Sequence, residues 1–104
     1  MHADVARSRL TDFIALTLLP IGSAVRVAER LRSGGAPGDV LDEVAGFPRG
    51  GGAPACELRA RAREAFDAAR AQGIEPVAWD SASYPVALTT IVDPPPVLWV
   101  RGSI

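Results

Sequence analysis

The segment YPVALTTIVDPPPVLWVRG, residues 84–102, decides the fold of the second half of the chain. Three prolines stand directly before the apolar run 97–100, and such a run is typical of a strand that is covered on both faces. The stretch IEPVAWD, residues 74–80, predicts an earlier strand, and Pro85 suits the first turn of a short helix between the two. Two strands joined by a short helix indicate the opening of an α/β sheet.

A sheet of only two strands is marginally stable in water. We therefore expect the strand at 97–100 to pair with further strands that the 104 residues do not contain. Either a further chain segment or another molecule would supply them. The chain is accordingly expected to be part of a larger folded unit.

Four helices are predicted before residue 73, at 3–19, from Ser23, from Asp39 and at 57–72. In each of them, apolar residues recur with the spacing of one buried helix face. The expected buried positions are Leu10, Phe13, Ile14, Thr17 and Leu18 in the first helix, Ala24, Val27, Ala28 and Leu31 in the second, Val40, Leu41 and Val44 in the third, and Leu58, Ala62, Ala65, Phe66 and Ala69 in the fourth.

Capping residues set the expected limits of these helices. Pro20 ends the first helix, Ser23 and Asp39 are N-cap candidates for the second and third, and Gly73 is placed to cap the end of the fourth. After Gly73 the apolar pattern changes. The predicted fold class is therefore α+β, with a small four-helix domain at 1–72 and the first strands of an α/β domain at 73–104.

Composition argues against several classes of function. Hydrophobic residues make up 48% and charged residues 22% of the chain, which is ordinary for a folded domain. The formal net charge is −1, whereas autonomous nucleic-acid binders usually carry a clear positive excess. All 11 basic residues are arginine, which we attribute to genome composition.

The side chains that usually carry catalysis or bind metals are scarce. One cysteine, Cys56, excludes an internal disulfide and fits a reducing cytoplasm. With one histidine, His2, there is no zinc cluster and no Ser-His-Asp or Cys-His set. Asp80 and Asp93 stand at the ends of predicted elements, where aspartate commonly caps a turn. We expect no metal, no cofactor and no enzymatic activity.

Two apolar or glycine-rich stretches have structural interpretations. FIALTLLPIG, residues 13–22, loosely resembles a signal peptide but is too short to span a bilayer, so it is predicted to form a core helix. GGGAPA, residues 50–55, has the spacing of a dinucleotide-binding loop, but no strand precedes it and Pro54 lacks an amide donor. We interpret it as a linker.

The stretch LLPIGSAVRVAERL, residues 18–31, resembles a helix-hairpin-helix element, in which a glycine turn lets backbone amides approach DNA phosphates. The candidate DNA contacts are Gly22, Ser23 and Arg26. The usual element has two glycines and this one has a single glycine, so a packing turn between two core helices is the alternative. Three further arginines, at 59, 61 and 63, are predicted to form a solvated helix face.

The second half of the chain resembles a known family, the bacterial DNA-processing protein A family (DprA, also called Smf). The resemblance rests on the order and spacing Y-P-x-x-L-x-x-I-x-D-P-P-x-x-L-x-x-R-G, and the helical region before it is similar to the family's N-terminal domain, which is of the SAM or helix-hairpin-helix type. The principal motif residues, expected to be structural, are Tyr84, Pro85, Asp93, Pro94, Arg101 and Gly102.

The resemblance implies a protein that binds and protects incoming single-stranded DNA and helps to load the recombinase RecA in natural transformation. Family members continue into a Rossmann-like domain whose glycine-rich, arginine-bearing loop contacts DNA. That loop has no counterpart in these residues, so weak or no DNA binding is expected. The resemblance is also compatible with a homodimer, and no membrane association is expected. The alternative is a free-standing helical adaptor that adds residues 97–100 to the sheet of a protein partner.

Overall fold

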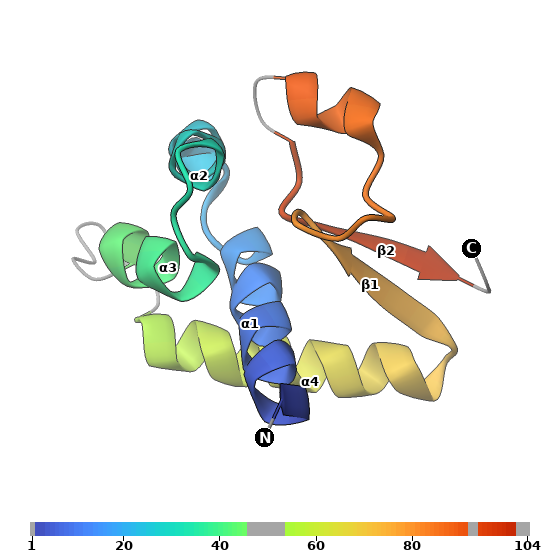
Figure 1. The fold of residues 1–104 in the computed structure, drawn as a ribbon. Coiled ribbons are helices and arrows are strands. Elements are labelled where there is room, and N and C mark those ends of the chain that lie inside the picture. The colour runs from blue at the N-terminus through green and yellow to red at the C-terminus, as the bar shows by residue number, and fades with distance from the viewer. Residues whose placement is uncertain (1, 46–53, 92–93, 102–104) are drawn as a thin grey trace.

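The computed structural model describes residues 2–45, 54–91 and 94–101, and side chains from residue 7 onward, Ile21 excepted. Helices dominate the first part and a pair of strands follows (Figure 1). The elements are α1 (His2–Thr17), the 3-10 helix η1 (Ile21–Ser23), α2 (Ala24–Arg32), α3 (Pro37–Ala45), α4 (Ala55–Ala71), β1 (Ile74–Ala78), the 3-10 helix η2 (Val86–Thr90) and β2 (Val97–Arg101).

All four predicted helices are present, but the predicted start of the third and the predicted capping role of Ser23 were wrong. α3 begins at Pro37 rather than after Asp39, because the fixed φ of proline suits the first helical position and the Val40 amide already donates to the Ala36 carbonyl. Ser23 precedes α2, but its backbone is already helical and its side chain makes no capping hydrogen bond. Gly73 follows α4 with a φ of 73°, as predicted for a left-handed glycine cap.

Helix α1 lies at the centre of the structure and contacts α3, α4 and both strands. Phe13, Ile14, Ala15 and Leu16 are therefore all buried, although no single helix face contains four consecutive residues. The predicted stripe was wrong at its C-terminal end, where Thr17 and Leu18 are both exposed. The reason is that the neighbours of α1 surround its middle and leave residues 17 and 18 in solvent, whereas Leu19 packs against the core.

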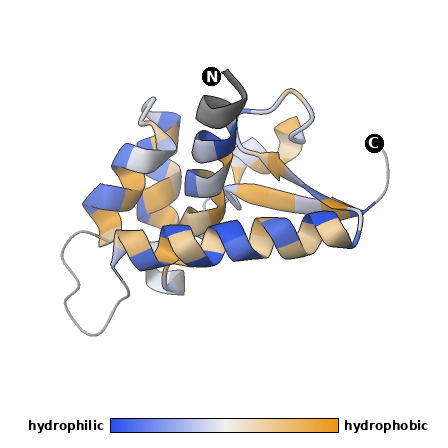
Figure 2. Cartoon of the chain, turned by 90° about the horizontal axis from the view of Figure 1, so that it is seen from below, coloured by the Kyte–Doolittle hydropathy of each residue, from blue (hydrophilic) through white to orange (hydrophobic). Residues whose placement is uncertain are grey.

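Helix α4 runs beneath both the other helices and the strands, and its polar and apolar residues alternate by turn (Figure 2). Leu58 and Ala62 are buried against α1, and Phe66 packs on the edge of the same core. On the solvent side, Arg61 Nη2 and Glu57 Oε1 form an i, i+4 ion pair at 2.7 Å. The amphipathic pattern in the sequence is thus confirmed.

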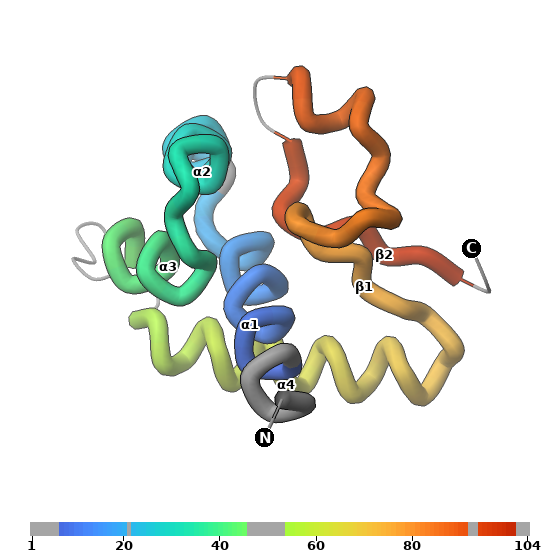
Figure 3. The backbone as a smooth tube through the Cα atoms, in the orientation of Figure 1, coloured from blue at the N-terminus to red at the C-terminus, as the bar shows by residue number. Residues whose placement is uncertain are grey.

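Strands β1 and β2 form an antiparallel pair, with Ile74 opposite Arg101 and Ala78 opposite Val97. Figure 3 follows the chain out of β1, through η2 and back along β2. The predicted coverage of β2 on both faces was wrong, because Trp99, which shares a face with the buried Val97, is 41% exposed. In the described residues this sheet has two strands, so no further strand covers the outer edge of β2.

The helices and strands share one buried core. Ala78 and Val97 belong to the same apolar cluster as Phe13 and Leu41. Polar contacts also join the two parts, because Arg9 Nε lies 2.7 Å from Asp80 Oδ2 and Arg32 donates to the carbonyls of Thr89 and Ile91 in and after η2. The α+β content is confirmed, and the domain boundary near residue 73 stays a prediction.

Candidate functional site

The candidate hairpin residues lie together at the turn between α1 and α2. Gly22 is exposed, Ser23 is half-buried and its amide donates to the Pro20 carbonyl at 2.9 Å, and Arg26 is exposed on the first turns of α2. Gly22 has no positive φ, and nothing lies within 4 Å of the place where a Cβ would be. Neither backbone conformation nor space requires glycine here, which favours the packing turn over a phosphate-binding hairpin.

Most described arginines contact other parts of the chain. Ion pairs join Arg7 to Asp67 at 3.0 Å, Arg9 to Asp80 at 2.7 Å and Arg30 to Glu43 at 2.8 Å, in addition to the Arg61 pair in α4. Cation–π contacts place Arg7 and Arg70 beside the Phe66 ring. Acidic partners therefore neutralise much of the positive charge that DNA phosphates would need.

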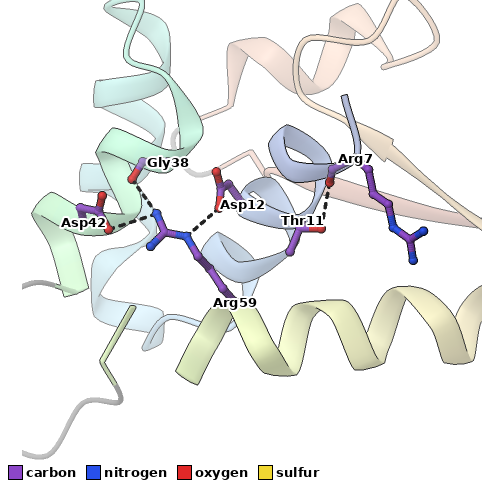
Figure 4. A network of polar contacts seen from close by, with 6 residues as sticks. All are labelled: Arg7, Thr11, Asp12, Gly38, Asp42 and Arg59. Atoms are coloured by element: carbon purple, nitrogen blue, oxygen red, sulfur yellow. Dashed lines mark hydrogen bonds and ion pairs between the residues drawn. The ribbon is translucent and has the colours of Figure 1, made fainter. Parts of the chain in front are cut away.

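Arg59 was predicted to lie on a solvated helix face, and that prediction was wrong. Its side chain is 29% exposed and joins three helices (Figure 4). Arg59 Nε donates to Asp12 Oδ1 of α1 at 2.8 Å, and Arg59 Nη2 lies 3.1 Å from Asp42 Oδ1 of α3. The hydrogen bond to Asp12 raises the pKa of the Arg59 guanidinium, against a smaller opposing effect of burial.

Gly38 provides the space for this network. A Cβ at Gly38 would lie 2.8 Å from Asp12 Oδ2, and the Gly38 carbonyl accepts a hydrogen bond from Arg59 Nη2 at 3.3 Å. A side chain at this position would displace Asp12. In the sequence, Asp12 indicated this network, because it is the acidic residue at the edge of an apolar helix segment. A carboxylate that is largely covered needs a partner.

The concave surface beside the network is polar. It has a volume of about 410 Å³ and is lined by Arg7, Ser8, Thr11, Asp12, Arg59 and Arg63. The Thr11 hydroxyl donates to the Arg7 carbonyl at 2.8 Å, and the carboxylates of Asp12 and Asp67 hold the guanidinium groups of Arg59 and Arg7. Four of the six lining residues, Arg7, Thr11, Asp12 and Arg59, therefore have polar partners within the chain, as in a structural network.

Tyr84 closes the loop between the two strands. Its ring is 5% exposed and lies 5.6 Å from the Trp79 ring, centroid to centroid, at an interplanar angle of 58°. Its hydroxyl donates to the Pro95 carbonyl at 2.6 Å. Burial raises the pKa of the Tyr84 hydroxyl above its ordinary value. The first motif residue thereby holds the proline run that leads into β2.

The other motif residues have separate positions. Pro85 is exposed and precedes η2 in an extended conformation, and Pro94 is buried. Arg101 is the exposed last residue of β2. Asp93, Gly102 and most of the glycine-rich stretch 50–55 lie outside the described residues. The motif therefore gathers around the loop and β2, away from the polar concavity.

An apolar groove separates the ends of α1 and α2 from β2. Its volume is about 370 Å³, and one side is formed by Leu16, Leu19 and Val27 while Val97 and Trp99 form the other. Ser23, one of the proposed DNA contacts, lies in this groove and not in a basic surface. The groove is suited to an apolar side chain or segment, and not to a phosphate.

The described residues contain neither a cluster of metal ligands nor a membrane-spanning helix. Within residues 2–45, 54–91 and 94–101, no group of three His, Cys, Asp or Glu side chains is arranged to hold a metal ion. No helix of the described chain is long and apolar enough to cross a membrane.

No protein-family model, curated protein or solved structure matches this chain.

Replacing Asp12 by alanine should lower the free energy of unfolding by about 1.5–3 kcal/mol, because a partly buried guanidinium loses its principal acceptor. The matched control is Asp67→Ala, which removes an exposed Arg–Asp pair and should cost about 0.5 kcal/mol or less. Urea unfolding followed by tryptophan fluorescence measures both. Equal losses for the two variants would contradict the role given to the Arg59 network.

Tyr84 is the single tyrosine, so its ionisation can be followed by ultraviolet absorbance without overlap from others. We expect the folded chain to titrate above about pH 10, because burial disfavours the phenolate and raises the pKa of the hydroxyl. The neutral Tyr84 ring contributes its full stability below the pKa that Tyr84 has in the unfolded chain. This contribution is lost as the pH rises through the pKa that Tyr84 has in the folded chain. Tyr84→Phe should lack this alkaline loss, and a titration at the ordinary pKa would refute the buried placement.

Gly22→Ala should leave the fold intact and raise the free energy of unfolding by about 0.4–1 kcal/mol, because the position is open and its φ is ordinary. Gly73→Ala is the matched control, since Gly73 has a φ of 73°. A left-handed backbone strains any residue with a Cβ, so this variant should lower the free energy of unfolding by about 1–2 kcal/mol. Chemical denaturation compares the two, and strong destabilisation by Gly22→Ala would show that the turn requires glycine after all.

Proposed function

We propose that this chain is the N-terminal part of a DprA-like DNA-processing protein of the cytoplasm. In this proposal the helices and the strand pair β1–β2 precede a Rossmann-like domain, and that domain binds and protects single-stranded DNA and aids RecA loading. The chain itself is not an enzyme. It supports the main domain by packing and does not form the DNA-binding surface.

The observation that carries the proposal is the arrangement of the Y-P to R-G motif. Tyr84 fixes the Pro95 carbonyl, Pro94 is buried, and the chain then enters β2 with Trp99 exposed. These motif residues thus contribute to presenting one strand. A connection into a larger sheet requires a strand whose edge is free to pair. The motif residues hold β2 in such a position.

The charge distribution supports the second part of the proposal. The chain has a formal net charge of −1, and Arg7, Arg9, Arg30 and Arg59 are paired with carboxylates at 2.7–3.0 Å. Phosphate contacts would have to compete with these pairs. The candidate hairpin adds one exposed arginine, Arg26, and lies beside an apolar groove.

The second candidate is a helical adaptor that docks on a protein partner. The groove between α2 and β2 and the exposed Trp99 favour it, because exposed apolar surface commonly marks a protein interface. The two candidates differ in their genetic context. A reading frame that continues after Ile104 with a strand and a glycine-rich, arginine-bearing loop supports the first, whereas a stop codon followed by unrelated sequence supports the adaptor.

Fluorescence anisotropy with a labelled single-stranded oligonucleotide tests the DNA part of the proposal. We expect no saturable binding to the 104-residue chain, even at low salt, because its arginines are largely neutralised within the fold. Arg26→Ala should therefore leave the titration unchanged. Tight binding that weakens steeply with salt and is reduced by Arg26→Ala would overturn the proposal and assign DNA contact to the α1–α2 turn.

A further inference from the structure

The two edges of the strand pair differ in their backbone hydrogen-bonding groups. The Trp79 amide donates to the Pro96 carbonyl at 2.8 Å, and the register places Val77 opposite Leu98 and Glu75 opposite Val100. Residues that share hydrogen bonds in an antiparallel pair alternate with residues whose amides and carbonyls point away from the partner strand. The outward set is therefore 74, 76 and 78 in β1 and 97, 99 and 101 in β2.

Among the residues that the structure describes, the outer edge of β1 is protected and that of β2 is open. Pro76 belongs to the outward set of β1 and has no amide to donate, which is a common protection of an edge strand. On β2 the outward residues Trp99 and Arg101 are both exposed and both carry an amide. Val97 is 4% exposed, so the accessible part of this edge begins after it.

We propose that a second copy of this chain pairs with the open edge, antiparallel, so that Trp99 of each copy lies opposite Arg101 of the other. The two-fold axis then passes beside Val100, and the sheet has four strands in the order β1–β2–β2–β1. The amides and carbonyls of Trp99 and Arg101 on each strand face those of the other. Antiparallel pairing of identical strands is closed and self-complementary, as a two-fold dimer requires.

The pairing of Trp99 with Arg101 across the edge selects the second copy as the occupant. Residues 99 and 101 lie on the same face of β2, so this register places each Arg101 guanidinium beside the indole of the facing Trp99. A cation over an indole face is favourable, and the pair forms twice. No like charges face each other, because the residue opposite each arginine is a tryptophan and Val100 lies opposite Val100.

Burial excludes the neighbouring register. If Trp99 faced Trp99, Arg101 would have to lie opposite Val97, which is almost fully covered within the groove beside α1 and α2. The register with Trp99 opposite Arg101 places only exposed residues at its hydrogen-bonded positions. Its edge is short, so we expect a dimer that dissociates on dilution.

Self-pairing does not depend on the proposed function. In a DprA-like protein the next strand of the Rossmann-like sheet would occupy the same edge, and the dimer would then be a property of this chain in isolation. The test uses the chain alone, without DNA. Its failure would leave the DNA-processing proposal intact, and its success would not establish it.

Sedimentation velocity over a concentration series of the 104-residue chain measures the dimer. Arg101→Glu and Trp99→Ala should each raise the dimer Kd about tenfold, because each removes both cation–π pairs. Arg26→Glu is the matched control, with the same charge change on α2, and should leave the Kd unchanged. A monomer at every concentration, or a dimer that the two edge variants do not weaken, would overturn the proposal.

Disulfide trapping tests the register. Facing Val100 residues form a non-hydrogen-bonded pair with a Cα separation of about 4.5 Å, which is within the range of a disulfide. Val100→Cys in a Cys56→Ser background should oxidise to a covalent dimer faster than Ile91→Cys, an exposed control outside the strand. Equal rates for the two variants would refute the pairing of β2 with β2.

Discussion

The burial of four consecutive residues of α1, Phe13–Leu16, is the constraint on which the rest of the structure depends. A helix buries a continuous segment of this kind only when neighbours cover it on several sides. Here α3 and α4 cover two sides and the strand pair contributes Ala78 and Val97 to the same core. The position of β2 is therefore fixed by the helices as well as by its partner strand.

The Arg59 network adds specificity to this packing. Apolar contacts alone allow helices to slide or rotate with little change in buried area. A guanidinium that binds Asp12 of α1 and Asp42 of α3 has a single position relative to both helices. Gly38 completes the arrangement, because its missing side chain leaves room for the Asp12 carboxylate. The arginine thus has a structural role between the helices and is not available to a ligand.

The uncovered side of the molecule is β2 with its adjoining groove. Tyr84 and the proline run hold this strand in place, and Pro76 protects the opposite edge of the pair. One edge of the sheet is therefore closed and the other is open. Both the DNA-processing proposal and the self-pairing proposal follow from this asymmetry, and they differ in which strand covers the open edge.

The amino-acid sequence by itself determined the number and approximate limits of the helices, the two strands and the glycine cap at Gly73. These features follow from local periodicity and from residues with restricted or special backbone conformations, which are properties of short segments. Only the tertiary structure decided that Arg59 is a clamp between helices, that Leu18 is exposed and that β2 has an open edge. Each of these depends on which residues far apart in the chain meet, as Arg59 and Asp12 do, and periodicity along one segment contains no information about its neighbours.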